Sequence, residues 1–343
     1  MKMRAVILLF LAAVCFTGCS RSGIGDKVIV KAIYLEYSGE YTATLLALRS
    51  APSADTGEVT EQASYLSGQG ATLGQALAAA EEKENRQVFY GQNELLLLGP
   101  ELCRAGAFEA CRYLAKETSG RPNMAVYGVD LAPQEFLELD QKGKDALESI
   151  NQLEKKGYYK TYLYEFGAGD GQGVLPGIRL AGAKAEPLGA AVYAGGEPAL
   201  VLKGSDLEVA ALLSGQQREL EMELELEGQA VRFQVRSPRL FFESAGRGEG
   251  LQMTLHMTGH IQKIVTPQGA AAPGPDRELE QTINAALAHR LLGIIESTYG
   301  QGNDVFRLAS WLYNQDEAAC RTQQAAGTLW QGKMRPECRL HLV

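Results

Sequence analysis

Hydrophobic and polar positions along the chain follow two periods, and these predict strands alternating with helices. Residues 27–36 and 41–50 are apolar, β-prone runs separated by Ser38-Gly39-Glu40, which is typical of a β-hairpin. Apolar residues recur at helical spacing over 72–83, with Thr72 as the N-cap. The other elements expected in this half are a strand at 94–98, a helix at 101–116, a strand at 124–131, a short helix opened by Pro133 and an amphipathic helix at 145–156, with residues 51–60 as a polar loop and 167–176 as a glycine-rich boundary.

The second half contains a stretch in which charge alternates with hydrophobicity. Residues 219–227 alternate Glu with Leu or Met, and residues 231–236 alternate apolar side chains with Arg and Gln. A turn at Gly228-Gln229 would fold them into a hairpin with one apolar face and one charged face. The predicted charge pairs are Glu225 with Arg232 and Glu221 with Arg236. We interpret the glutamate row as one side of this charge ladder, and docking of a basic partner is the alternative.

The remaining elements complete a mixed α and β pattern. Residues 251–261 alternate as a strand, residues 276–299 form a long amphipathic helix, and 303–313 and 338–343 are expected to be a helix and a strand, with a linker at 266–275. His256 and His260 fall in the expected strand, where four residues span about 13 Å. No Glu lies between them, so no metal site is expected.

The first eighteen residues have the layout of a secretory signal. Lys2 and Arg4 precede twelve apolar residues, Ala5–Phe16, which are too few to span a bilayer. Thr17-Gly18-Cys19 resembles a bacterial lipobox, in which Cys19 would be diacylated and become the first residue of the mature chain. An ordinary signal peptide cut elsewhere is the alternative. Two acyl chains give a stable membrane anchor, whereas a single chain does not.

Charge excludes two classes of partner for the mature chain. The formal net charge of the whole chain is −8, and removing the two positive charges of the signal brings it to −10. Nucleic acid and anionic lipid repel such a chain, so lipid at Cys19 is expected to hold it at the membrane. The signal predicts that the mature chain lies on the extracytoplasmic side, and no later segment approaches the roughly 20 apolar residues of a spanning helix.

Four cysteines follow the lipobox. Cys103 and Cys111 are expected in one helix, about 12 Å apart and too far to bridge, so we interpret both as buried apolar residues. Cys320 and Cys338 are a candidate disulfide pair, because the extracytoplasmic compartment permits one, although both could stay free. No cysteine spacing resembles a zinc site.

A glycine-rich stretch from Ser67 to Gly74, SGQGATLG, invites comparison with phosphate-binding loops. A Walker loop needs Lys followed by Ser or Thr after its last glycine, and Gln75-Ala76 stands there instead. A dinucleotide fingerprint starting at Gly68 would need a glycine at Leu73. We interpret the glycines as a turn from strand into helix. The chain also has no Gly-x-Ser-x-Gly elbow and no HExxH motif, so no catalytic residues are expected.

The same stretch and the residues after it carry a family resemblance. In order, the chain has the helix Leu73–Ala80, the basic Arg86 and the segment Val88–Leu102, which reads VFYGQNELLLLGPEL. This order resembles the Ger(x)C family, the lipoprotein C subunit of the germinant receptors of endospore-forming bacteria, whose motif has the form (L/V)YFGHxxxLLLGEEL. Further matches in family order are Leu114, Leu175-Pro176, Gly189–Leu202, Leu207–Leu213 and Asp304-Val305-Phe306. The chain departs from the family at Cys19-Ser20-Arg21, where CWD is usual, at Gln92, where histidine is usual, and near Cys320, where tryptophan is usual.

The resemblance implies fold, partners and location. We expect a multidomain α+β, mixed α/β protein whose mixed sheets are flanked by helices, with a long helix near the C-terminus. The expected parts are a signal peptide over 1–18, N-terminal Ger(x)C-like α/β structure over 19–175 and a C-terminal Ger(x)C-like α/β domain over 176–343. The family implies a non-enzymatic germinant receptor subunit, required for spore germination and lipid-anchored at Cys19 on the outer face of the spore inner membrane. Its implied partners are the integral membrane A and B subunits, with no cofactor and no metal.

A solute-binding lipoprotein of a transporter is the alternative function. Such proteins usually have two similar α/β lobes joined by a hinge. The glutamate-rich hairpin and the long helix near the C-terminus do not predict matching lobes.

Overall fold

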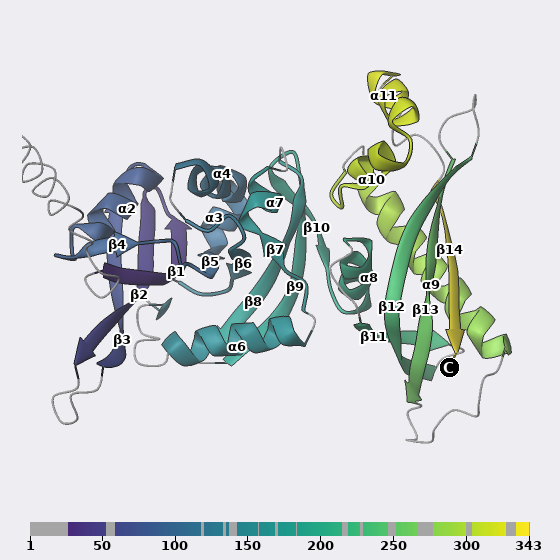
Figure 1. Cartoon of the computed structure of the whole chain (residues 1–343), viewed down its shortest axis with the longest axis horizontal. Coiled ribbons are helices and arrows are strands. Elements are labelled where there is room, and N and C mark those ends of the chain that lie inside the picture. The colour runs from purple at the N-terminus through teal and green to yellow at the C-terminus, as the bar shows by residue number, and fades with distance from the viewer. Residues whose placement is uncertain are drawn as a thin grey trace, which may run out of the picture.

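The structure is a computed structural model that describes residues 27–52, 59–117, 120–132, 135–136, 143–156, 158–168, 171–182, 184–214, 219–226, 229–245, 252–265, 277–299, 304–326 and 334–342. Two sheets with helices packed on them follow one another along the long axis of the molecule (Figure 1). The first sheet mixes parallel and antiparallel strands, and so does the second. The expected fold class, multidomain with mixed sheets, flanking helices and a long helix near the C-terminus, is confirmed.

The first sheet contains ten strands, ordered β10-β9-β8-β6-β5-β1-β2-β3, with β4 paired to β1 and β7 to β6. Its strands are β1 Lys27–Tyr37, β2 Tyr41–Pro52, β3 Val59–Gly70, β4 Gln87–Phe89, β5 Leu95–Leu98, β6 Ala125–Val129, β7 Thr161–Tyr162, β8 Gly173–Ala181, β9 Lys184–Ala194 and β10 Glu197–Leu202. β1 and β2 form the predicted antiparallel hairpin. Residues 51–52 and 59–60 of the expected polar loop instead extend β2 and begin β3, and 53–58 lie outside the described residues.

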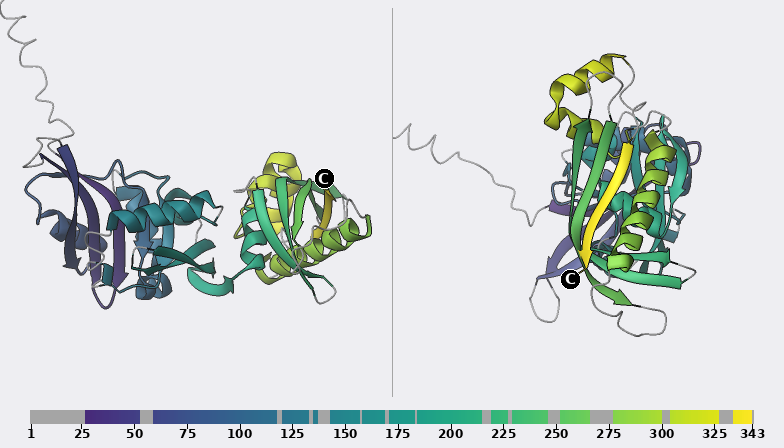
Figure 2. Two further views of the ribbon diagram at one scale, coloured as in Figure 1. Left: turned by 90° about the horizontal axis from the view of Figure 1, so that it is seen from below. Right: turned by 90° about the vertical axis from the view of Figure 1, so that its right-hand side faces the viewer.

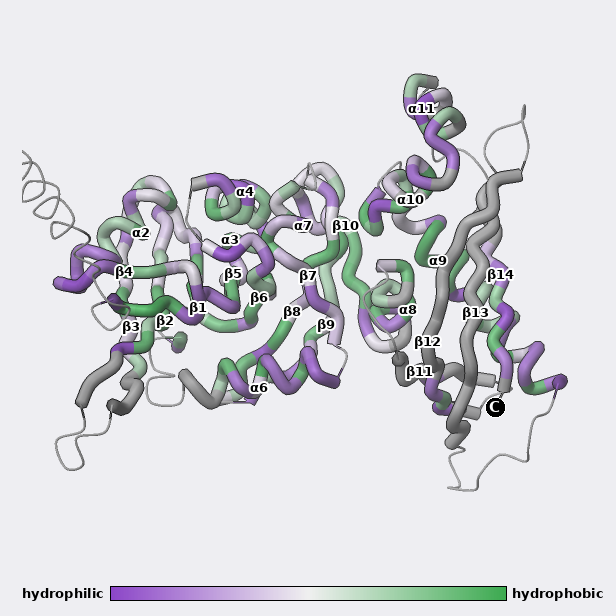
Figure 3. Tube along the Cα trace, in the orientation of Figure 1, coloured by the Kyte–Doolittle hydropathy of each residue, from purple (hydrophilic) through white to green (hydrophobic). Residues whose placement is uncertain are grey.

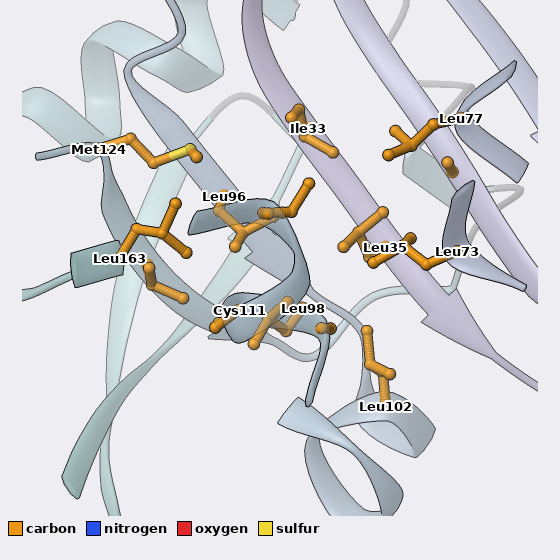
Figure 4. Close-up of a cluster of buried hydrophobic side chains, with 14 of the residues drawn as sticks. Ile33, Leu35, Leu73, Leu77, Leu96, Leu98, Leu102, Cys111, Met124 and Leu163 are labelled. Carbon is orange, nitrogen blue, oxygen red and sulfur yellow. The ribbon is translucent and has the colours of Figure 1, made fainter. Parts of the chain in front are cut away.

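Helices cover both faces of this sheet because its central strands are buried on both sides. They are α2 Leu73–Glu81, α3 Pro100–Ala105, α4 Ala107–Glu117 and α7 Leu163–Gly167 on one face, and α6 Gly143–Lys155 on the other. β1 shows the alternation directly: Ile33 and Leu35 pack under α2 and α3, whereas Tyr34 belongs to the core on the α6 side. Figure 4 shows the first of these cores, where Leu73 and Leu77 of α2 lie near Leu35.

The second sheet has four strands in the order β11-β12-β13-β14. The strands are β11 Glu219–Leu226, β12 Gln229–Ala245, β13 Gln252–Val265 and β14 Met334–Leu342; the helices with them are α8 Ser205–Leu213, α9 Arg277–Tyr299, α10 Leu308–Gln315 and α11 Glu317–Ala326. The long helix α9 runs beside the sheet (Figure 2), with Ile283, Leu287 and Leu291 buried at the predicted spacing. Asn284 on α9 bonds both backbone groups of Leu340, at 3.0 and 2.8 Å, and so occupies the free edge of β14.

The two sheets share a buried core. Val174, Val192 and Leu202 from the first sheet pack in one cluster with α8, α9 and α10. The predicted boundary between residues 175 and 176 lies inside β8, and the strands of the first sheet continue to Leu202. The change from one sheet to the other therefore falls between Leu202 and Glu219.

The hairpin of β11 and β12 has a different register from the predicted one. Glu223, not Glu225, pairs with Arg232, and Glu219 pairs with Arg236. The pair that closes the hairpin is Leu226 with Gln229, so Gln229 belongs to the strand rather than to the turn. After this shift of two residues Arg232 still pairs with a glutamate, because its Nε atom lies 2.6 Å from a carboxylate oxygen of Glu223.

Several other element boundaries differ from the sequence expectations. The single helix expected at 101–116 is two helices separated at Gly106, so Cys103 and Cys111 lie in different helices. The helix expected from 303 begins only at Leu308. The glycine-rich boundary at 167–176 contains the end of α7 and the start of the buried strand β8. The linker at 266–275 and Pro133 lie outside the described residues.

Candidate functional site

The glycines of the Ser67–Gly74 stretch lie where β3 leads into α2, and Gly68 and Gly70 allow close packing of the helix on the strand. Gly68 and Gly70 lie inside β3, directly beneath α2. A Cβ atom on Gly68 would lie 2.2 Å from the backbone nitrogen of Ala80 and 2.4 Å from the carbonyl oxygen of Ala76. Glycine is therefore required here because the backbone of a helix approaches the strand. The chain does pass from strand into helix here, because β3 ends at Gly70 and α2 begins at Leu73, and the glycines let the helix pack closely on the strand.

Helix α2 begins as predicted. The Thr72 hydroxyl accepts the N–H of Gln75 at 3.2 Å, and the Gln75 side chain accepts the N–H of Thr72 at 3.2 Å, which completes a capping box. The apolar residues that recur at helical spacing in this segment are all buried: Leu73, Ala76, Leu77 and Ala80. The capping box satisfies the N–H groups of Thr72 and Gln75 within the chain, so this end of α2 has a structural role.

The segment Val88–Leu102, which carries most of the family resemblance, forms β4, β5 and the start of α3. Its Gly99 precedes Pro100 and lies against the buried carboxylate of Glu36 on β1. That carboxylate accepts the N–H of Leu102 at 2.8 Å and so caps α3 from another element. A Cβ on Gly99 would lie 2.2 Å from a carboxylate oxygen of Glu36, which explains the glycine of this motif.

Glu36 was not singled out by the sequence analysis. Glu36 lies on β1, 66 residues before the N–H group that it accepts. The sequence feature that could have identified it is a single acidic residue within a run of apolar residues. Beside it, the Tyr34 hydroxyl donates to the carbonyl oxygen of Leu131 at 2.9 Å, and burial, followed by the nearby Glu36 charge, raises the pKa of Tyr34 above its ordinary value. These groups hold helices and strands together, and nothing in their arrangement supplies an accessible acid or base.

A groove of about 700 Å³ opens beside this cap, and its acidic lining could attract a cationic or amine ligand. Its lining includes the carboxylates of Glu36, Glu101, Asp130 and Glu135. Each already has a protein partner: the N–H of Leu102, Arg104 at 2.9 Å, Arg179 at 3.5 Å and the N–H of Ala132 at 2.8 Å, respectively. None of these four carboxylates in the groove is therefore without a protein partner.

A second groove of about 720 Å³ lies between the start of α2 and α4. Tyr41, Leu73 and Ala110 give it an apolar floor, and Arg112 and Lys116 border it. Arg112 lies 3.8 Å from Glu109 on the same helix. Among the residues whose side chains the structure describes, no group of three or more His, Cys, Asp or Glu could hold a metal ion.

We call the ten-stranded sheet with its helices the first unit, and the four-stranded sheet with α8 to α11 the second unit. The family-like segment Asp304-Val305-Phe306 lies where these two units meet. The N–H of Asp304 donates to the side-chain oxygen of Gln172 at 2.8 Å, and the Arg307 guanidinium donates to the carbonyl oxygen of Glu165. Val305 and Phe306 are buried in the shared core. A cavity of about 80 Å³ remains between the units at this point. Sequence reasoning matched this motif but missed the residues it contacts, because they lie more than 130 positions away.

Asp304 also fixes the start of α10. Its carboxylate accepts the N–H groups of Leu308 and Ala309 at 2.6 and 3.0 Å. Burial raises the pKa of Asp304, and these helix N–H groups oppose that rise. Arg307, which precedes the helix, adopts the left-handed conformation with φ of 56°, unusual for a non-glycine residue. Residues 304–307 therefore contact both the first turn of α10 and the first unit.

The cysteines that the structure describes are four free thiols. Cys111 and Cys320 are buried, and Cys103 and Cys338 are partly buried. The candidate disulfide between Cys320 and Cys338 is therefore not formed in this structure. Burial raises the pKa of both the Cys103 and the Cys338 thiols to about 12, which keeps both thiols protonated near neutral pH. Cys19 lies outside the described residues.

Comparison with known proteins agrees with this architecture. Residues 21–169 match the family model described as the spore germination protein N-terminal domain. The crystal structure of the GerBC protein matches with a TM-score of 0.52 and 10% sequence identity, over 91% of this chain and 96% of that chain. No curated protein matches the chain. None of the helices in the described ranges is long and apolar enough to cross a membrane.

The two comparisons cover the chain in complementary ways. The family model identifies the first unit from its sequence, and the GerBC structure has the same fold over nearly the whole length. The segments that carried the resemblance, Val88–Leu102 and Asp304-Val305-Phe306, form a helix cap and the contact between the units. These matches support the resemblance to the Ger(x)C family of spore germination proteins: residues 21–169 match the N-terminal domain model, and the GerBC protein has the same fold.

Proposed function

We propose that this protein is a lipid-anchored, non-catalytic subunit of a nutrient germinant receptor that is required for spore germination. The match of residues 21–169 to the spore germination protein domain carries the proposal. That domain begins two residues after Cys19, where the lipobox-like Thr17-Gly18-Cys19 would place a diacylated N-terminus. Two acyl chains would hold the acidic chain stably on the extracytoplasmic face of the spore inner membrane.

Docking onto the integral membrane A and B subunits is the mechanism that best fits these features. The described residues include buried cores, capped helices and an exposed ion pair between Glu223 and Arg232 on the β11–β12 hairpin, and the polar side chains of Asp304 and Gln172 hold the structure together. Association with membrane partners would then depend on surface complementarity, while the lipid anchor keeps the protein at the membrane surface. A tethered protein meets its partners at a raised effective concentration.

The test is a pull-down of the tagged full-length protein from detergent-solubilised spore membranes, with the co-purifying proteins identified by mass spectrometry. A Cys19→Ala variant runs in parallel. Recovery of two polytopic germinant receptor subunits, reduced in the variant, is the expected result. Recovery of a transporter permease, together with micromolar binding of a nutrient to the soluble chain by calorimetry, would replace the proposal with the solute-binding alternative.

A further inference from the structure

The last strand of the four-stranded sheet places one histidine beside another on the neighbouring strand. β14 runs parallel to β13, and in their register His260 on β13 lies opposite His341 on β14. Residues opposite each other in neighbouring strands share a face of the sheet, and the strands are about 4.8 Å apart. The chain has four histidines in all, and two of them meet at this position.

This position is on the outer face of the sheet. Leu340 is buried in the core, whereas the side chain of the next residue, His341, is 68% exposed. Side chains alternate between the two faces of a strand, and Figure 3 shows hydrophilic and hydrophobic residues alternating along β14. An ion in solution can therefore reach His341.

Glu280 in the first turn of α9 determines which nitrogen of His341 carries a proton. The Nδ1 atom of His341 lies 3.3 Å from a carboxylate oxygen of Glu280. A carboxylate only accepts hydrogen bonds, so in the neutral ring Nδ1–H is the donor and Nε2 keeps its lone pair. Metal-binding histidines almost always have this arrangement, in which the other ring nitrogen donates to a carboxylate, a carbonyl or water.

Two arginines on the same face would oppose the binding of a cation, but each has a glutamate beside it. Arg236 on β12 lies opposite His260, and Glu219 on β11 lies opposite Arg236. Arg339 on β14 forms an ion pair with Glu337 at 3.1 Å. These glutamates offset the charge of the arginines next to the histidine pair.

We propose that His260 and His341 bind a Zn²⁺-like divalent transition-metal ion across β13 and β14, with Glu280 as the positioning residue of His341. Imidazole nitrogen is a common ligand of Zn²⁺, at about 2.0–2.1 Å, and Zn²⁺ usually takes four ligands. Water completes the coordination, because the face is exposed. Unlike His256 and His260, which are about 13 Å apart along one strand, this pair is joined across two strands.

A metal ion at this position would fasten β14 to the sheet. Among the described strands, β14 pairs with β13 alone, and Asn284 of α9 occupies its other edge. An ion that binds the folded chain more tightly than the unfolded chain stabilises the fold by mass action. The site goes beyond the proposed function, because it needs neither the lipid anchor nor the receptor subunits.

Isothermal titration calorimetry with Zn²⁺ tests the proposal on the untagged mature chain. This parent chain carries Cys19→Ser, so that the thiol of residue 19 cannot bind the ion. His260→Ala and His341→Ala each remove one ligand, and His256→Ala is the matched control on the same strand. Glu280→Ala removes the carboxylate that orients the His341 ring. Urea unfolding with and without Zn²⁺ is measured for each variant.

The parent chain is expected to bind one Zn²⁺ ion, which should raise its urea midpoint. Both ligand variants should lose this binding and this shift, whereas His256→Ala should keep them. Glu280→Ala should bind Zn²⁺ about ten-fold more weakly, with an unfolding midpoint near that of the parent when zinc is absent.

Three results would overturn the proposal. They are a parent chain that does not bind Zn²⁺, binding that persists in His260→Ala or in His341→Ala, and an equal loss of binding in His256→Ala. None of them bears on the pull-down, so the metal site and the proposed function are tested separately.

Discussion

Replacement of Gly68 by alanine tests the central packing contact of the first unit. In the structure, β3 approaches α2 so closely that a side chain on Gly68 would meet the helix backbone at Ala76, Ala79 and Ala80. A flexible side chain could move away, but helix backbone cannot move alone. The substitution should therefore displace the helix as a whole and loosen the core beneath it.

The size of the effect follows from the distances. A Cβ atom on Gly68 would lie 2.2 Å from the nitrogen of Ala80, and ordinary contact begins near 3.4 Å, so α2 would have to shift by about 1.2 Å. Overpacking of this kind costs about 1–3 kcal/mol. The shift also reduces contacts of the buried Leu73 and Leu77 with β1 and β2. We expect Gly68→Ala to lower the free energy of unfolding by about 3 kcal/mol.

The assay is urea unfolding of the mature chain, followed by circular dichroism. Gly293→Ala is the matched control, because it makes the same chemical change at an exposed position of α9 with nothing within 4 Å of the added carbon. Alanine there should raise the free energy of unfolding by about 0.5–1 kcal/mol, since glycine is a poor helix former. A Gly68→Ala protein as stable as the original, or a Gly293→Ala protein destabilised to the same degree, would refute the reasoning.

Four further results are expected. Glu36→Ala removes the carboxylate that caps α3 and should lower the free energy of unfolding by about 2 kcal/mol in the urea assay, whereas Glu36→Gln, which keeps an acceptor, should cost less. Asp304→Ala removes the acceptor at the start of α10, which should cost about 1–2 kcal/mol and speed limited proteolysis at the junction; unchanged proteolysis would count against its role there. Thiol titration of a mature chain whose N-terminal cysteine is replaced by serine should find four free thiols after unfolding, and two would mean that Cys320 and Cys338 are bridged. Above about pH 9 the folded chain keeps Cys103 and Cys338 protonated, whereas the unfolded chain releases both protons. The free energy of unfolding should therefore fall with rising pH, by up to about 1.4 kcal/mol per pH unit for each thiol, until the pH reaches their folded pKa of about 12. A urea midpoint that stays constant from about pH 9 to 11 would contradict this.

Elements with a strong hydrophobic period could be predicted from the sequence. The buried faces of α2 and α9 agree with the sequence pattern, because one apolar stripe on a helix has a single way to meet a core. β3 was missed because an edge strand with many polar residues has no comparable stripe. Gly68 is ambiguous for a different reason: glycine suits a turn and a close approach equally, and only the position of α2 distinguishes them.

The register of the β11–β12 hairpin shows a second limit. Side chains alternate with a period of two, so a shift of two residues keeps the apolar and charged faces intact. Glutamates occupy 219, 221, 223 and 225, so Arg232 meets a glutamate in either register. The pattern therefore determines which face is charged, while the residue at which the turn closes decides the pairs.

The candidate site residues were less predictable because their partners are distant in sequence. The acceptor for Leu102 lies on β1, and the contacts of Asp304 and Arg307 lie before β8. A resemblance can match such a segment without showing what it touches. Cys19 remains a prediction, since it lies outside the described residues.

The position of the family-like motifs bears on where specificity should be sought. Gly99 is fixed by the Glu36 carboxylate, and Asp304 by the start of α10 and by Gln172, so these motifs preserve helix ends and the joint between the units. Groups engaged in this way are not available to a partner. Recognition of a partner would then depend on exposed residues outside the motifs, such as Glu82 and Lys83 after α2 and Glu223 on β11. Substitution of such exposed residues should change partner recovery without changing stability, whereas substitution within the motifs should change stability first.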